Sequence, residues 1–119
     1  GNPHFVIFVD DVDAMDLTAV GPAIENNPIF PNRTNVEFVE VVSSSRVRQR
    51  TWERGAGETL ACGSGACATC VAGRLLSRTD AGVVVQLKGG DLLVDWEKSG
   101  EVFLEGPAEE LFTGLWCRS

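Results

Sequence analysis

The sequence is short of the residues that several functional classes require. His4 is its only histidine, and nothing else in the chain would complete a histidine metal site. Basic residues number 10 against 17 acidic ones, a net charge of −7, which argues against nucleic acid or an anionic membrane as the main partner. No apolar run reaches the length that spans a bilayer, and no signal peptide is visible. We therefore expect a cytoplasmic protein with no membrane partner.

What is present fits one domain covering residues 1–119. Hydrophobic residues make up 44% of the chain and charged residues 23%, proportions typical of a folded protein rather than a disordered tail. The first residue is Gly1 rather than methionine, and an apolar run already begins at Phe5. We expect such a start in a processed product or in one half of a longer protein.

The hydrophobic pattern predicts a sheet and one buried helix. Residues 64–76 are apolar or small on nearly every face, which is typical of a helix that is buried all round. A second, shorter helix is predicted over residues 17–26. Predicted strands cover residues 5–10, 35–42, 46–53, 83–88, 92–97, 101–105 and about 109–116. The prediction is an α+β fold, with a mixed or antiparallel sheet wrapped around a central buried helix.

Three of the four cysteines are close together in the sequence, whereas the cysteines of a disulfide scaffold are spread along the chain. Cys62, Cys67 and Cys70 lie within nine residues, and Cys117 is distant. A disulfide framework would scatter its cysteines and need an export signal, so we expect a reducing compartment and mostly free thiols. Clustered cysteines in such a chain indicate a metal site or a catalytic thiol.

The residues before the buried helix carry the strongest functional signal. Cys62 lies in a glycine-rich turn just ahead of it. The free N–H groups and positive dipole end of a helix favour an anion, so they lower a thiol pKa there. The N–H groups of Gly63, Ser64 and Gly65 are also suited to a substrate carboxylate. A thiolate beside a bound carboxylate predicts proton abstraction at the carbon next to that carboxylate.

Other polar and sulfur residues have plainer interpretations. Cys67 and Cys70 fall inside the predicted helix, where core packing is the default. Glu53 and Arg54 end a strand beside the glycine-rich turn, which fits substrate contacts or a surface ion pair about equally well. A lone histidine such as His4 is more often structural than catalytic. The stripe Arg46, Arg48 and Arg50 is expected to be a solvated strand face.

A ferredoxin-like electron carrier is the alternative from another class. The spacing Cys62-x4-Cys67-x2-Cys70 with a distant Cys117 has the ligand order of a plant-type [2Fe–2S] cluster. Two features weigh against this interpretation. The gap between Cys70 and Cys117 holds 46 residues, and residues 64–76 are predicted to be continuous helix, whereas a cluster loop wraps irregularly around iron.

Three blocks of the sequence together resemble the diaminopimelate epimerase family. They are the start Gly1-Asn2-Pro3-His4, the pair Asn35-Val36, and the long run ERGAGETLACGSGAC over residues 53–67. The order and spacing of the blocks agree with that family, and the resemblance covers the whole chain. It matches only the C-terminal half of the family's two-domain protein.

The resemblance implies cofactor-independent epimerisation of L,L-diaminopimelate to meso-diaminopimelate, for lysine and peptidoglycan synthesis. Two cysteines act as thiolate base and thiol acid on opposite faces of the substrate, and Cys62 matches one of them. Gly63 and Ser64 match groups that bind the reacting carboxylate. Polar residues beside the cysteines match His4 and Glu53, and the residues that bind the distal end of the substrate match Asn2, Asn35 and Arg54.

The second cysteine of the family belongs to the N-terminal half, which this sequence does not contain. We therefore expect the missing N-terminal half to be the chain's partner, and little or no activity without it. The family often forms dimers, so a homodimer is a further expected partner state. An inactive carboxylate-binding or structural domain is the remaining alternative.

Overall fold

The computed structural model describes residues 4–29, 34–53, 56–59, 63–97, 100–105 and 115–118. Within them the chain forms one eight-stranded sheet, two α-helices and a short 3-10 helix. The strands are β1 (His4–Phe8), β2 (Asn35–Ser43), β3 (Arg46–Glu53), β4 (Gly57–Thr59), β5 (Gly82–Leu87), β6 (Gly90–Trp96), β7 (Glu101–Glu105) and β8 (Leu115–Arg118). The helices are η1 (Val12–Ala14), α1 (Leu17–Glu25) and α2 (Gly63–Leu75).

The sheet is mixed, with strand order β1-β2-β3-β5-β6-β7-β8 and β4 paired to β3. Two neighbouring pairs are parallel, β1 with β2 and β3 with β5, and the other pairs are antiparallel. A helix lies in the connection within each parallel pair, α1 in the first and α2 in the second. This follows from geometry, because parallel neighbours need a long crossover that a tight turn cannot supply.

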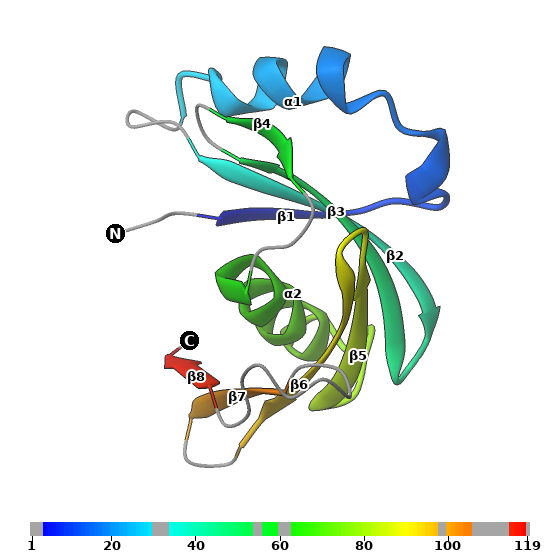
Figure 1. The fold of residues 1–119 in the computed structure, drawn as a ribbon, viewed down its shortest axis with the longest axis vertical. Helices are drawn as coiled ribbons and strands as arrows, with labels where there is room; N and C mark the ends of the chain where they lie inside the picture. Colours follow the sequence, from blue (N-terminus) through cyan, green and yellow to red (C-terminus); the bar gives the residue numbers. More distant parts are fainter. Residues whose placement is uncertain are drawn as a thin grey trace.

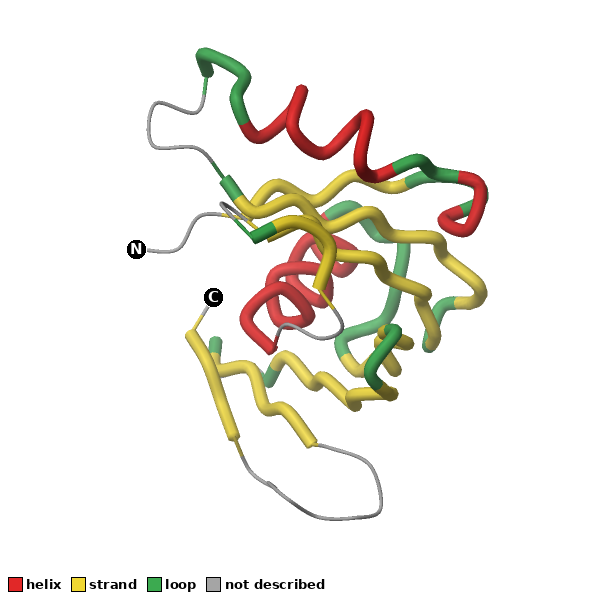
Figure 2. Tube along the Cα trace, turned by 45° about the horizontal axis from the view of Figure 1, so that its top comes forward, coloured by secondary structure: helices red, strands yellow, loops and turns green. Residues whose placement is uncertain are grey.

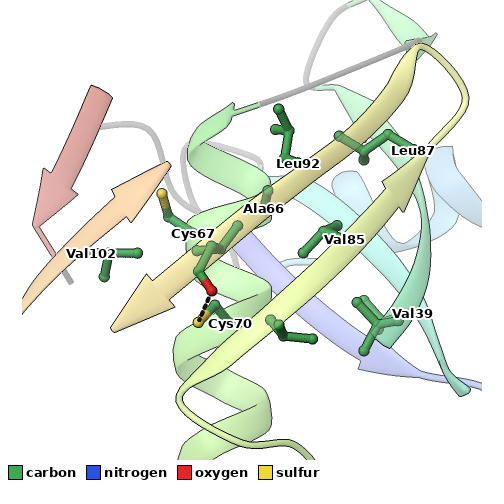
Figure 3. Close-up of a cluster of buried hydrophobic side chains, with 11 residues drawn as sticks. Val39, Ala66, Cys67, Cys70, Val85, Leu87, Leu92 and Val102 are labelled. Atoms are coloured by element: carbon green, nitrogen blue, oxygen red, sulfur yellow. Dashed lines mark hydrogen bonds between the residues drawn. The ribbon is translucent and has the colours of Figure 1, made fainter. Parts of the chain in front are cut away.

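The sheet curls around α2 and leaves α1 on its outer side (Figures 1 and 2). The larger core cluster joins small residues of α2, including Ala66 and Cys70, to inward-facing valines such as Val39 and Val85 (Figure 3). Since side chains alternate along a strand, odd-numbered residues of β2 face α2 and even-numbered ones face α1. The predicted α+β fold with a sheet around a central buried helix is confirmed.

A smaller core cluster fixes α1 against the outer face of the sheet. It contains Leu17 of α1, with Val36 and Phe38 of β2. Gly21 brings α1 so close to the sheet that a Cβ there would lie 2.3 Å from the Trp52 ring. The sheet therefore has apolar contacts on both faces over β2 and β3.

Two expectations from the sequence are wrong. Arg50 is not part of a solvated face, because its guanidinium group is held by Glu58 and by two backbone carbonyls. Cys67 is disulfide-bonded, although mostly free thiols were expected, while the buried Cys70 is free. Spacing along the chain carries no information about which side chains meet across a fold.

No helix in the described part of the chain is long and apolar enough to cross a membrane.

Candidate functional site at the start of helix α2

The predicted site is centred on the first residues of α2. The helix begins at Gly63, directly after Cys62 in the sequence. Cys62, Asn2 and Arg54 lie outside the described residues. The structure therefore reports on His4, Asn35, Glu53, Gly63 and Ser64, and it brings several of them together.

His4 joins β1, β2 and α2 through its two ring nitrogens. Its Nδ1 is hydrogen-bonded to Oε1 of Glu37 on β2, and its Nε2 lies 3.1 Å from the hydroxyl oxygen of Ser64. Only 10% of the His4 side chain is exposed. The single histidine is thus oriented at the start of α2, between a buried carboxyl group and a helix-end hydroxyl group.

Glu37 is a buried carboxyl group in the middle of an apolar strand. Its side chain is completely buried, and its Oε2 has no hydrogen-bond partner in the described part of the chain. Burial raises the pKa of Glu37 and so does the negative charge of Glu53, while the hydrogen bond and the charge of His4 lower it. The net effect is a raised pKa, because the desolvation of the buried carboxylate outweighs its stabilisation by His4.

Glu53 and Asn35 complete the polar edge of the site. Glu53 ends β3, and its Oε1 accepts a hydrogen bond of 3.2 Å from the hydroxyl group of Thr59 on β4. The strand register puts Glu53 at the same end of the sheet, because its neighbour Trp52 pairs with Val36 at the start of β2. Asn35 begins β2 beside His4 in the parallel register and is buried.

The first turn of α2 offers hydrogen-bond donors to an anion. The first backbone N–H groups of a helix have no partner within the helix, and the helix dipole makes this end positive. The first turn of α2 contains Gly63, Ser64 and Gly65, and no acidic residue lies in it. This arrangement is suited to a carboxylate, and the histidine and carboxyl groups beside it are suited to proton transfer.

The later cysteines of α2 pack in the core, as expected. Cys67 and Cys70 both belong to the larger core cluster (Figure 3). The Cys70 thiol donates to the carbonyl of Ala81 at 3.3 Å, and burial raises its pKa to about 11. A thiol with such a pKa remains protonated at neutral pH and is a poor nucleophile.

The structure disfavours the ferredoxin alternative. Cys67 and Cys70 lie in a regular helix that starts at Gly63, whereas a plant-type cluster needs an irregular loop.

Sequence reasoning missed Glu37. The signal was present, because Glu37 is a charged residue between Val36 and Phe38, on the strand face that also carries Asn35 and Val39. A charged residue at an inward-facing strand position is rarely buried without a partner. The partner, His4, is 33 residues away in the sequence, so only the parallel pairing of β1 with β2 reveals it.

Several proteins of known sequence or structure are similar to this chain. A protein named diaminopimelate epimerase from Pelotomaculum thermopropionicum is 54% identical over 114 residues, which are 96% of this chain and 41% of that protein. One of the same name from Brachyspira hyodysenteriae is 56% identical over 114 residues, 96% of this chain and 40% of that protein. A PhzF-family phenazine biosynthesis protein from Enterococcus faecalis has a similar fold, with a TM-score of 0.66, 18% identity, and coverage of 87% of this chain and 37% of that one.

The chain thus spans about two fifths of the length of the curated relatives it matches. The family model described as diaminopimelate epimerase matches residues 1–111, a range that includes every site residue discussed above. On this match over most of its length, the chain belongs to the diaminopimelate epimerase family.

Proposed function

We propose that this chain is the C-terminal half of a diaminopimelate epimerase and supplies one half of its active site. The intact enzyme would convert L,L-diaminopimelate to meso-diaminopimelate without a cofactor, as a step of lysine and peptidoglycan synthesis in the cytoplasm. The family match over residues 1–111 carries the proposal. The greater length of the relatives supports a second domain as the partner of this one.

In this proposal Cys62 is one of two acid–base groups. As a thiolate it takes the hydrogen from the substrate α-carbon as a proton, so that the C–H bond breaks, an S–H bond forms and the electron pair stays on carbon. A thiol of the other domain then gives a proton to the opposite face of that carbon. The roles of the two cysteines reverse when the reaction runs backwards, which two acid–base groups of one kind allow.

The start of α2 supports the charge that develops during this step. Backbone N–H groups of Gly63 and Ser64 bind the carboxylate next to the reacting carbon, where negative charge accumulates in the transition state. His4 and Glu53 act beside the cysteines and set their protonation. The contacts of His4 with Ser64 and of Glu53 with Thr59 support this role, because they bring both residues to the same end of the sheet.

We assign binding of the distal end of the substrate to Asn2, Asn35 and Arg54. A guanidinium group is suited to the distal carboxylate because its planar N–H groups pair with two oxygens at once. Asn35 lies beside His4 on the neighbouring strand, which supports a position near the rest of the site. A homodimer of the complete enzyme belongs to the proposal on the strength of the family alone.

The test measures exchange of the α-hydrogen of diaminopimelate in deuterated water. The reduced chain is incubated with the L,L and meso isomers, first alone and then with the N-terminal half of a relative supplied as a separate polypeptide. We expect little or no inversion by the chain alone and inversion with solvent deuterium once both halves are present. Cys62→Ala should abolish it, whereas Cys70→Ala, which removes a buried thiol of the same helix, should leave it.

Two outcomes would contradict the proposal. Rapid inversion by the chain alone would mean that a complete two-base site exists without the second half. Absence of exchange when both halves are folded and associated would favour a carboxylate-binding or structural domain.

A further inference from the structure

We propose that Glu37 is a positioning residue of this site, which binds Nδ1–H of His4 and so leaves Nε2 of the same ring as a hydrogen-bond acceptor at the start of α2. The inference rests on the proposed function for its catalytic meaning. The contacts that support it lie entirely within this chain, so they do not depend on the second half of the enzyme.

The strand pairing explains why the two side chains meet. β1 and β2 are parallel, with His4 opposite Asn35 and Val6 opposite Glu37. His4 and Glu37 point to the face of the sheet that α2 covers, two residues apart in register. The side chain of Glu37 is fully buried and that of His4 is 10% exposed, so water cannot readily replace either partner.

The carboxylate decides which ring nitrogen carries the hydrogen. An ionised carboxyl group only accepts hydrogen bonds, so the nitrogen bonded to Glu37 must be the one with N–H. A neutral imidazole has one N–H, and this leaves Nε2 with its lone pair free to accept. The hydroxyl group of Ser64, 3.1 Å from Nε2, then donates to it.

The hydrogen bond that the described part of the chain records for Glu37 is the one with His4. Its Oε2 makes no hydrogen bond in the described residues, and burying a half-paired carboxyl group is costly. A valine would fit the apolar strand around it, which already carries Val36, Val39 and Val41. The contact with His4 is therefore the feature that the glutamate supplies and a valine does not.

An acceptor nitrogen at this position has a clear meaning for the proposed reaction. In the proposed reaction a cysteine thiol must lose a proton before it can act as the base, and an acceptor nitrogen at the start of α2 is suited to that step. A ring with N–H at Nε2 and the lone pair at Nδ1 would present a donor instead. Glu37 acts only through His4, and so it is a positioning residue rather than a catalytic one.

The test uses the fact that His4 is the only histidine in the chain. Nitrogen NMR of the 15N-labelled imidazole shows directly which ring nitrogen carries hydrogen. Spectra are recorded at increasing pH, and the tautomer is assigned at the pH at which the nitrogen shifts show a neutral ring. We expect the Nδ1–H form in the unaltered chain, loss of it as the main form in Glu37→Val, and retention in Glu37→Gln, whose amide oxygen also accepts.

Glu40→Val provides the matched control. Glu40 lies on the same strand, faces the other side of the sheet, and contacts Arg48 and the backbone N–H of Val12. It should leave the His4 tautomer unchanged. Comparison of Glu37→Val with Glu40→Val separates loss of the specific contact from loss of an acidic residue on β2.

The proposal is overturned if the unaltered chain shows the Nε2–H form at this pH, or if Glu37→Val keeps the Nδ1–H form. The first of these results needs no variant, so the proposal stays testable even where Glu37→Val fails to fold. The tautomer is independent of turnover. An Nδ1–H ring in a chain that fails the α-hydrogen exchange test would contradict the proposed function and leave the positioning role intact.

Discussion

At the scale of single residues, the buried polar side chains differ in how completely they are paired. Thr69 of α2 donates to the amide oxygen of Gln49 at 2.6 Å, and the amide nitrogen of Gln49 donates to Thr51 at 3.0 Å. This chain of hydrogen bonds satisfies the groups that it buries, as most buried polar groups are. Glu37 is paired through one oxygen only. Thr79 Oγ1 and Trp96 Nε1 are also buried without a hydrogen-bond partner in the described residues, but Glu37 is the acidic side chain among the three.

Cys70 gives the chain a dependence of stability on alkaline pH. Burial raises the pKa of its thiol to about 11 from an ordinary value of 9.0, with a smaller contribution from the charge of Asp95. The folded state therefore holds the thiol proton more tightly than the unfolded state does. The stabilisation is complete below about pH 9 and is lost as the pH rises toward 11, by up to about 3 kcal/mol. Urea unfolding at several pH values across this interval measures it.

The control for this prediction is Cys70→Ala. Removing the sulfur costs stability at every pH because it leaves a small cavity, but it removes the titrating group. The free energy of unfolding of the variant should fall less steeply between pH 9 and 11 than that of the unaltered chain. Parallel curves would show that the buried thiol is not the cause.

At the scale of elements, Arg50 joins three of them at one point. From β3 its guanidinium group forms two hydrogen bonds with Glu58 of β4, at 2.8 and 2.9 Å. It also donates to the carbonyl oxygens of Val12 and Met15, at the start of η1 and just after it. Hydrogen bonding to Arg50 lowers the pKa of Glu58. The residue therefore holds the connection between β1 and α1 against the sheet.

Replacing Arg50 by lysine should weaken this connection although the charge is kept. An ammonium group cannot match the planar fork that pairs with a carboxylate and reaches two carbonyls at once. We expect the free energy of unfolding to fall by about 1–3 kcal/mol, measured by urea unfolding near neutral pH.

Arg46→Lys is the matched control on the same strand. Arg46 approaches Asp91 at 3.5 Å, with both side chains more than 40% exposed. Such surface pairs contribute little, so the change should stay within about 0.5 kcal/mol. Equal losses in the two variants would mean that the geometry of the Arg50 contacts adds nothing.

At the scale of the whole molecule, the two helices are held very differently. The curled sheet encloses α2, whose buried residues run from Gly65 to Gly73, whereas α1 lies outside and buries Leu17, Gly21 and Glu25 (Figure 1). Local stability follows the number of buried contacts. The backbone hydrogen bonds of α2 should therefore open less often than those of α1.

Amide hydrogen exchange tests this difference. We expect amides in the middle of α2 to exchange at least about tenfold more slowly than those of the last turn of α1, a difference of about 1.4 kcal/mol in opening free energy. Mass spectrometry of peptides that cover the two helices separates them. Similar protection in both helices would contradict the expectation that the enclosed helix α2 is locally more stable than α1.

Much of the secondary structure follows from local patterns. The apolar helix is predicted over 64–76 and observed over Gly63–Leu75, because small and apolar residues on every face leave no polar side to expose. The strand over 46–53 matches β3, since its residues alternate. Gly89-Gly90 predicts the hairpin of β5 and β6, and Gly90 adopts a positive φ of 138° that disfavours other residues.

The sequence by itself determined both α-helices, most of the strands and the glycine-rich turn before the buried helix, because these depend on residues near one another in the chain. It did not predict η1 or β4, and the last strand, expected over about 109–116, is observed at Leu115–Arg118. The tertiary structure alone decided which strands are parallel, that Arg50 is tied to η1 and β4, and that His4 meets Glu37 and Ser64. These contacts depend on how the strands pair and how the helices pack on them, and periodicity within one segment does not specify its register against another.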